Sequence, residues 1–115
     1  MDHKDLDVWK RSMDLVELIY NLTTQFPSDE KFGLVSQMRR AAVSIPSNIA
    51  EGAARKGDKE LIQFLMIAIA SLSELETQYL ISVRLKFSSK NEKLEKTMVE
   101  TKKLLLGFRN YIQRK

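Results

Sequence analysis

SIPSNIAEG, residues 44–52, lies inside what otherwise reads as one long helix, and the rest of the architecture can be worked out from it. Pro46 has no amide donor, and in a helix its ring presses against the carbonyl of Ala42, four residues earlier. We therefore predict a helix that kinks at Pro46. The polar side chains that can satisfy the freed carbonyl are those of Ser44, Ser47 and Asn48.

On both sides of this stretch, apolar residues recur every three or four positions, as on the buried face of an amphipathic helix. Four such core stripes are present: Leu6, Trp9, Met13, Val16 and Tyr20; Val35, Met38, Ala42, Ile45 and Ile49; Leu61, Leu65, Ala68, Leu72, Leu75 and Tyr79; and Leu94, Met98, Thr101, Leu105, Phe108 and Ile112. We expect N-caps at Ser28 and Asp58, and a capping box from Ser89 to Glu92. Short connections predict one all-α domain, residues 1–115, folded as an antiparallel up-down-up-down four-helix bundle.

The chain carries more apolar residues than these four stripes need. The third helix has a second stripe that includes Ile62, Met66, Ile69 and Leu80, and Ser73 and Glu76 interrupt it. A helix that is apolar on two sides needs something to cover the second side, so we favour a homo-oligomer. The alternative is a wide core stripe in a monomer.

Three stretches of the sequence are distinctive: Leu6–Lys10, residues 37–52 with the sequence QMRRAAVSIPSNIAEG, and SLSELE at residues 71–76. In these stretches the chain resembles the bacterial four-helix-bundle proteins that are encoded in intervening sequences of 23S ribosomal RNA genes. The resemblance implies homopentameric rings. It also implies kinship with the accessory variability protein of diversity-generating retroelements, a basic pentamer that works with a reverse transcriptase and nucleic acid.

The composition argues against catalysis. The chain has no cysteine and one histidine, His3, so thiol chemistry, serine triads and inward-facing Glu-x-x-His pairs have no support. No phosphate-binding glycine motif is present. We expect no enzymatic activity and no cofactor or metal. The polar N-terminus is unlike a secretory signal, and the longest apolar run, residues 64–70, is short for a membrane span, so we expect a soluble, cytoplasmic protein.

A polar line follows the second helix at helical spacing, from Arg40 through Asn48 and Glu51 to Arg55. The simpler interpretation is kink repair and helix pairing. The sharper one is a lock between helices or subunits, in which Glu51 or Glu76 accepts hydrogen bonds from Arg39 or Arg40. The candidate lock residues are Arg39, Arg40, Asn48, Glu51, Ser73 and Glu76.

The net charge of +4 is unevenly distributed, from −4 over residues 1–30 to +4 over residues 91–115. One basic cluster lies before the third helix and another along the fourth. The candidate phosphate contacts are Arg55, Lys56, Lys59, Lys102, Lys103 and Arg109. A ring would repeat these clusters and bind nucleic acid mainly by salt-sensitive electrostatics. Solvated helix faces carry such lysines too, and no base-reading motif is present.

We therefore expect a non-catalytic, oligomeric binding or scaffold protein that contacts structured RNA or DNA. One alternative is an adaptor or antitoxin-like protein that uses its surplus apolar surface to bind a protein partner. Another is a ring without a partner, retained because its reading frame is carried by a mobile or intervening element.

Overall fold

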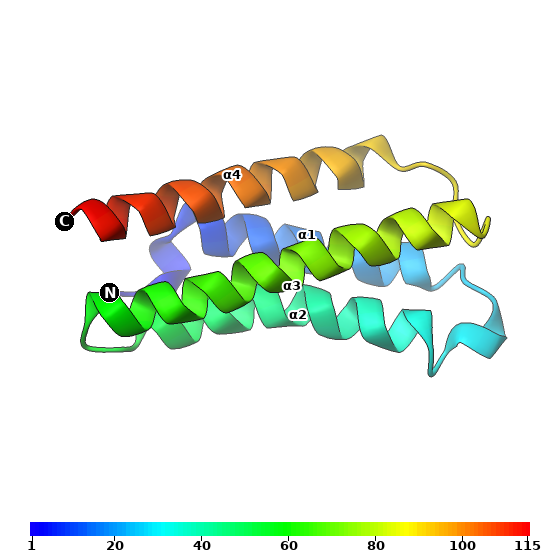
Figure 1. Cartoon of the computed structure of the whole chain (residues 1–115). Coiled ribbons are helices and arrows are strands. Elements are labelled where there is room, and N and C mark those ends of the chain that lie inside the picture. The colour runs from blue at the N-terminus through cyan, green and yellow to red at the C-terminus, as the bar shows by residue number, and fades with distance from the viewer.

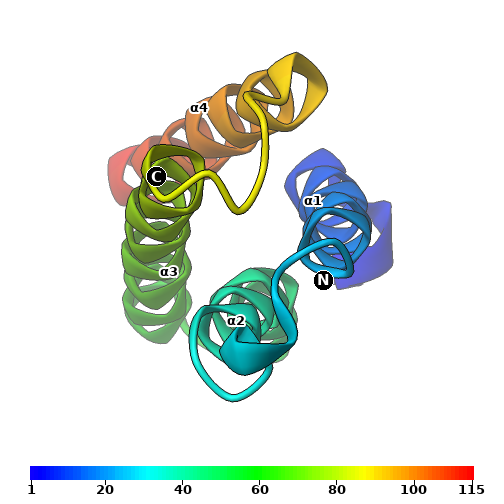
Figure 2. The same cartoon turned by 90° about the vertical axis from the view of Figure 1, so that its right-hand side faces the viewer.

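The computed structural model describes residues 1–115 as four helices in one bundle (Figure 1). The elements are η1 (His3–Asp5), α1 (Asp7–Thr23), η2 (Ser28–Glu30), α2 (Leu34–Ala53), α3 (Asp58–Arg84) and α4 (Glu92–Arg114). Successive helices run antiparallel, and Figure 2 shows them at the four corners of the bundle. Contacts join α1 to α2, α2 to α3, α3 to α4 and α4 back to α1, so α1 and α3 occupy opposite corners. The predicted all-α four-helix fold is confirmed.

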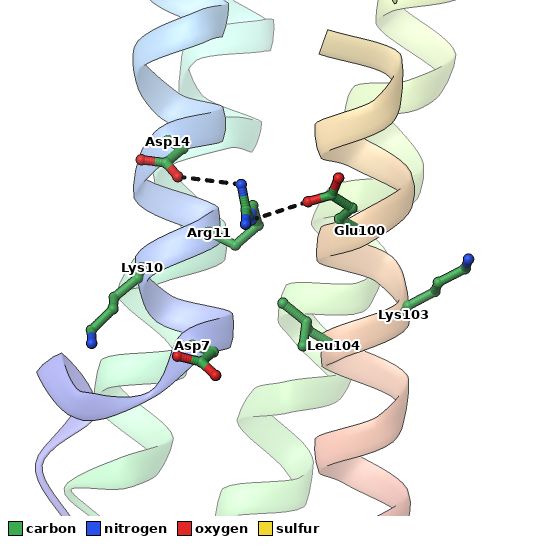
Figure 3. A pocket seen from close by; sticks show the side chains of 7 residues that line it. All are labelled: Asp7, Lys10, Arg11, Asp14, Glu100, Lys103 and Leu104. Carbon is green, nitrogen blue, oxygen red and sulfur yellow. Dashed lines mark ion pairs between the residues drawn. The ribbon is translucent and has the colours of Figure 1, made fainter. Parts of the chain in front are cut away.

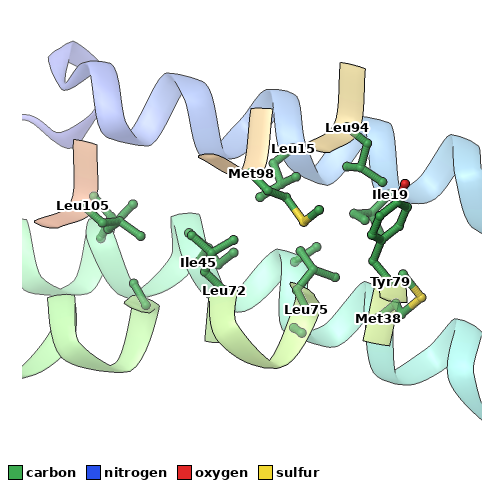
Figure 4. Packing of buried hydrophobic residues seen from close by; sticks show 14 of the residues in the cluster. Leu15, Ile19, Met38, Ile45, Leu72, Leu75, Tyr79, Leu94, Met98 and Leu105 are labelled. Carbon is green, nitrogen blue, oxygen red and sulfur yellow. The ribbon is translucent and has the colours of Figure 1, made fainter. Parts of the chain in front are cut away.

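The core stripes that the sequence predicts for α2, α3 and α4 are confirmed. Ile45, Leu72 and Leu105 are fully or almost fully buried and face one another at the centre of the bundle (Figure 4). Every predicted core residue of α2 and α3 is buried, and in α4 only Phe108 is partly exposed, at the edge of the cluster. The spacing identified these faces because each of these helices has one continuous stripe of large aliphatic side chains.

The predicted core face of α1 was only partly right, because Leu6, Trp9 and Val16 pack against the edge of the core instead of forming its centre. The stripe from Trp9 to Tyr20 lies at the boundary with solvent, where Met13 is 43% and Tyr20 is 40% exposed. The buried residues of α1 are Val8, Ser12, Leu15, Ile19 and Leu22. Ser12 explains the error, because its hydroxyl occupies a core position by donating to the Trp9 carbonyl at 2.7 Å. A polar residue in the true stripe made the neighbouring stripe look more regular.

Three predicted helix starts were also wrong in detail. Ser28 begins the short helix η2, and α2 starts only at Leu34, whose amide donates to Glu30 Oε1 at 3.1 Å. The cap of α4 is Asn91, whose Oδ1 accepts from the Leu94 amide at 3.0 Å, and not Ser89. Asp58 is the first residue of α3 rather than its cap. At α2 and α4 a neighbouring side chain, Glu30 or Asn91, accepts a hydrogen bond from a backbone amide of the first turn. No side chain caps α3.

Helix α2 continues without interruption through Pro46, which is buried. Asn48 Nδ2 donates to the carbonyl and the hydroxyl of Ser44, at 2.8 and 2.9 Å, and no side chain donates to the Ala42 carbonyl. The predicted repair of that carbonyl was therefore wrong, whereas the kink itself stays a prediction. Asn48 instead fixes Ser44, which connects α2 to α3.

Gly52 lies at a close approach of α2 to α3. A Cβ atom at Gly52 would be 2.9 Å from Leu61 Cδ1, 3.0 Å from Phe64 Cβ and 3.3 Å from the Leu61 carbonyl. Because ordinary contacts begin at 3.4 Å, only glycine fits here without a shift of α3. This close approach joins the end of α2 to the start of α3 and so positions the turn between them.

Helix α3 is long and apolar enough to cross a membrane by length and composition, with a mean hydropathy of 1.3 over its most apolar window. The longest unbroken apolar run, residues 64–70, is too short to indicate this property. The face of α3 from Leu61 to Tyr79 supplies the bundle core, but only 33% of that apolar window is buried inside the single chain.

Candidate nucleic-acid interface

Ser44 in the polar line of α2 contacts α3, whereas Arg40 and Glu51 in the same line are exposed. Ser44 Oγ lies 2.9 Å from Ser71 Oγ on α3, and Asn48 Nδ2 donates a hydrogen bond to the same Ser44 hydroxyl. Both interaction partners of Ser44 are partly buried. Hydroxyl pairs of this kind fix how two helices are aligned, since a polar group left unpaired in such a seam costs stability. Ser44 therefore contributes to the packing of α2 on α3.

Arg39 connects α2 to the end of α1. Its Nε donates to Thr23 Oγ1 at 2.9 Å, and its guanidinium lies over the Tyr20 ring, 4.4 Å from the ring centroid. Thr23 in turn donates to the Ile19 carbonyl at 2.8 Å. Arg40, one residue later, is exposed and forms no ion pair or hydrogen bond within the chain.

The acidic lock candidates have other partners within the chain. Glu51 pairs with Arg55, at 3.1 Å, and Glu76 Oε1 lies 3.9 Å from Lys102 Nζ. Ser73 is exposed on the outer side of α3. A lock between these carboxylates and Arg39 or Arg40 is not formed inside one chain and stays a prediction for contacts between chains.

The basic cluster at the α2–α3 turn divides into two kinds of residue. Arg55 is held by Glu51 and lies 3.9 Å from Glu60, and its guanidinium covers the Phe64 ring at 4.9 Å. Lys56 and Lys59 are exposed and form no ion pair. The two lysines are therefore the free cations of this turn, and Arg55 mainly fixes the local structure.

The last turn of α4 lies beside this cluster. Lys115 Nζ is 3.6 Å from Asp58 Oδ2, and Figure 1 shows the C-terminus at the same end of the bundle as the α2–α3 turn. Arg114 is exposed there without an ion pair. The fold thus brings Lys56, Lys59 and Arg114 to one end of the bundle.

The other predicted cations of α4 lie on two different sides. Arg109 and Lys102 face α3, where Arg109 Nη1 contacts Met66 Sδ at 3.4 Å. Lys103 borders a cavity of about 490 Å³ between α1 and α4 (Figure 3). There Arg11 pairs with Asp14 and Glu100, and Lys103 points away from them. Neighbouring positions on a helix point in different directions, so the predicted cluster is not one surface.

Comparison with known families identifies the family of the chain. The profile of a family described as 23S rRNA-intervening sequence protein matches residues 4–107, which is nearly the whole bundle. The chain belongs to this family. No curated protein sequence matches the chain significantly. The family to which the sequence was predicted to belong is therefore confirmed.

In this 23S rRNA-intervening sequence protein, the family match includes the α2–α3 turn and ends before the last turns of α4. Lys56 and Lys59 lie inside the matched range, whereas Arg109, Arg114 and Lys115 lie beyond it. The end of α4 is thus the part of the basic surface that the family profile does not describe.

A buried tyrosine, Tyr79, connects α3 to the start of α4, at the end of the bundle opposite the α2–α3 turn. Tyr79 Oη donates to Glu95 Oε2 at 2.7 Å and accepts from the Asn91 amide at 2.8 Å. Burial is the main reason that the pKa of the Tyr79 hydroxyl is raised above its ordinary value of 10.0, and Glu95 raises it further. The sequence identified Tyr79 as a core residue but gave no sign of this hydrogen-bonding role.

No three acidic or histidine side chains of the protein come close enough to hold a metal ion.

A basic groove that the sequence did not indicate lies between the end of α1 and the start of α2. The groove has a volume of about 600 Å³, and its lining includes Tyr20, Lys31, Phe32, Arg39 and Arg40. None of its nine lining residues is acidic. Antiparallel pairing places the end of the first helix beside the start of the second. The proximity of Tyr20 and Arg39 could therefore have been predicted from the sequence. Nothing in the helical spacing indicated Phe32, because it lies in a turn.

Proposed function

We propose that this protein is a non-catalytic, cytoplasmic homo-oligomer that binds structured RNA or DNA through phosphates at the α2–α3 turn. The observation that carries the proposal is the pair of exposed, unpaired lysines Lys56 and Lys59 beside the start of α3. Arg114 adds a third free cation. Unpaired lysines bind phosphate without first losing an internal partner, and phosphate contacts account for most non-specific affinity for nucleic acid. Lys102, Lys103 and Arg109 lie on other faces of the bundle, so phosphate contacts made by them would be separate from this site.

The proposed oligomer uses the outer face of α3. Met66, Ile67, Leu80 and Ile81 lie along it and are between 42% and 64% exposed. Aliphatic side chains repeated along one face of a helix commonly mark a contact with another protein. The resemblance to 23S rRNA intervening-sequence proteins implies a pentamer, and a ring would place several copies of each lysine pair on one particle. Repetition raises overall affinity even when each site is weak.

Light scattering on the purified protein tests the assembly. Five chains of 13.3 kDa give a particle of about 67 kDa. The Leu80→Glu variant should lower this mass while leaving the helical content unchanged, because Leu80 is 64% exposed in the single chain. The matched control is Val99→Glu on α4, a residue that is 52% exposed. A monomeric wild type would instead favour the adaptor function, with the α3 face covered by a different protein.

Charge reversal tests the nucleic-acid surface. The variant Lys56→Glu/Lys59→Glu leaves the internal partners of Arg55 intact and removes two proposed phosphate contacts. Its affinity for duplex DNA should fall, and the slope of log K against log salt should decrease by about 1.8. The matched control is Lys93→Glu/Lys96→Glu, which changes two exposed, unpaired lysines near the other end of the bundle. Equal losses in the two variants would show that only net charge matters and would reject this site.

A further inference from the structure

We propose that the groove defined by Tyr20, Lys31, Phe32, Arg39 and Arg40 binds an unpaired stretch of nucleic acid, by stacking a base on Phe32 and holding the adjoining phosphates with Arg40 and Lys31. This inference rests on the proposed function and adds a second site for a different form of the ligand. The α2–α3 turn lies at the opposite end of α2. The two sites can therefore be tested separately.

Phe32 is an exposed aromatic residue in the lining of the groove. Its side chain is 88% exposed, the largest exposed fraction among the large apolar residues of the chain. The residue lies in the turn after η2 and is not needed to cover the core. An aromatic ring held in water offers a flat face to a nucleobase, and every base can stack on such a face.

Three cations, Lys31, Arg39 and Arg40, line the groove together with Phe32. Lys31 Nζ lies 5.5 Å from the Phe32 ring centroid, and Arg39 already covers the Tyr20 ring. Arg40 has no partner within the chain, so its five donors are free for a phosphate. With three cations and no carboxylate in the lining, the groove suits a polyanion. Aromatic rings interleaved with cations are typical of proteins that bind single strands.

Duplex ligands fit this arrangement less well. Paired bases are stacked on one another and do not present a face to Phe32, whereas an unpaired base in a loop or tail does. The groove therefore distinguishes single-stranded from duplex nucleic acid, and the lysines of the α2–α3 turn, which meet only phosphates, do not.

Fluorescence anisotropy of the full chain with labelled oligo(dT) and with a labelled duplex tests the inference. The Phe32→Ala variant should bind oligo(dT) about 5- to 150-fold more weakly and bind the duplex as wild type does. The Arg40→Gln variant should reduce the single-strand salt slope by about 0.7. The control Leu85→Ala removes a side chain that is 54% exposed in the α3–α4 turn, and it should change neither affinity.

Three results would overturn the inference. Wild type that binds neither ligand refutes the proposed function and this site with it. Wild type that binds both ligands, with Phe32→Ala unchanged for oligo(dT), refutes this site alone. A lower particle mass of Phe32→Ala in light scattering shows that the groove is a contact between subunits instead.

Discussion

Replacing Gly52 by alanine should destabilise the bundle, although alanine is the better helix former. The new methyl group would lie 3.0 Å from Phe64 Cβ, which is 0.4 Å closer than an ordinary contact. It would also lie 3.3 Å from the Leu61 carbonyl, part of the α3 backbone. Leu61 Cδ1 can rotate away, but the other two atoms move only if α3 moves.

The magnitude follows from two opposing effects. Overpacking of this kind costs about 1–3 kcal/mol, and the higher helix propensity of alanine returns up to about 1 kcal/mol. Gly107→Ala is the matched control, because Gly107 is exposed within α4 and a Cβ there meets nothing within 4 Å. The control should gain up to about 1 kcal/mol. We therefore expect the two variants to differ by about 1–3 kcal/mol.

Thermal and urea unfolding followed by circular dichroism would measure this difference at equal protein concentration, because assembly makes Tm depend on concentration. In a chain of this length, about 1 kcal/mol corresponds to roughly 4 °C in Tm. We expect Gly52→Ala to melt roughly 4–12 °C below Gly107→Ala. A Gly52→Ala variant as stable as Gly107→Ala would refute the argument that a close helix approach requires glycine at this position.

The remaining predictions concern Tyr79 and Pro46. Tyr79→Phe should lose about 1–3 kcal/mol of stability at neutral pH in urea unfolding, because Glu95 and the Asn91 amide both lose a partly buried partner. The raised pKa of Tyr79 means that the folded state holds its proton more tightly, so the Tyr79 contribution to stability should be constant below about pH 10 and be lost above it; an equally steep fall above pH 10 in Tyr79→Phe would contradict this. Pro46→Ala should raise the Tm, because it adds a backbone donor inside α2, while binding per folded particle stays as in wild type. Lost binding in a normally assembled Pro46→Ala variant would make the proline part of a site.

The fold was largely predictable because helical periodicity reports directly on burial. Helices α2, α3 and α4 each have a stripe of large aliphatic residues, and those stripes are the core. Helix α1 has a second apolar stripe, formed by Val8, Leu15, Ile19 and Leu22, one position away from the predicted one, and the polar residue Ser12 lies within it. Only the partner helix decides between such stripes, and a single sequence does not contain that information.

The candidate site was less predictable, for geometric reasons. Lys102 and Lys103 are adjacent in sequence, yet one faces α3 and the other borders the α1–α4 cavity. Arg55 was predicted to contact phosphate, but two carboxylates hold it. Whether a cation is free depends on its neighbours in three dimensions. The same applies to Phe32, whose exposure in a turn leaves no periodic signal.

The most direct test of the central claim is fluorescence anisotropy of the wild-type protein with a structured RNA and a duplex DNA over a series of salt concentrations. Phosphate binding at a basic end of the bundle predicts an affinity that falls steeply and linearly in a plot of log K against log salt. The slope would give the number of phosphates contacted, and the double lysine variant should reduce it. No binding of either ligand at low salt would contradict the account.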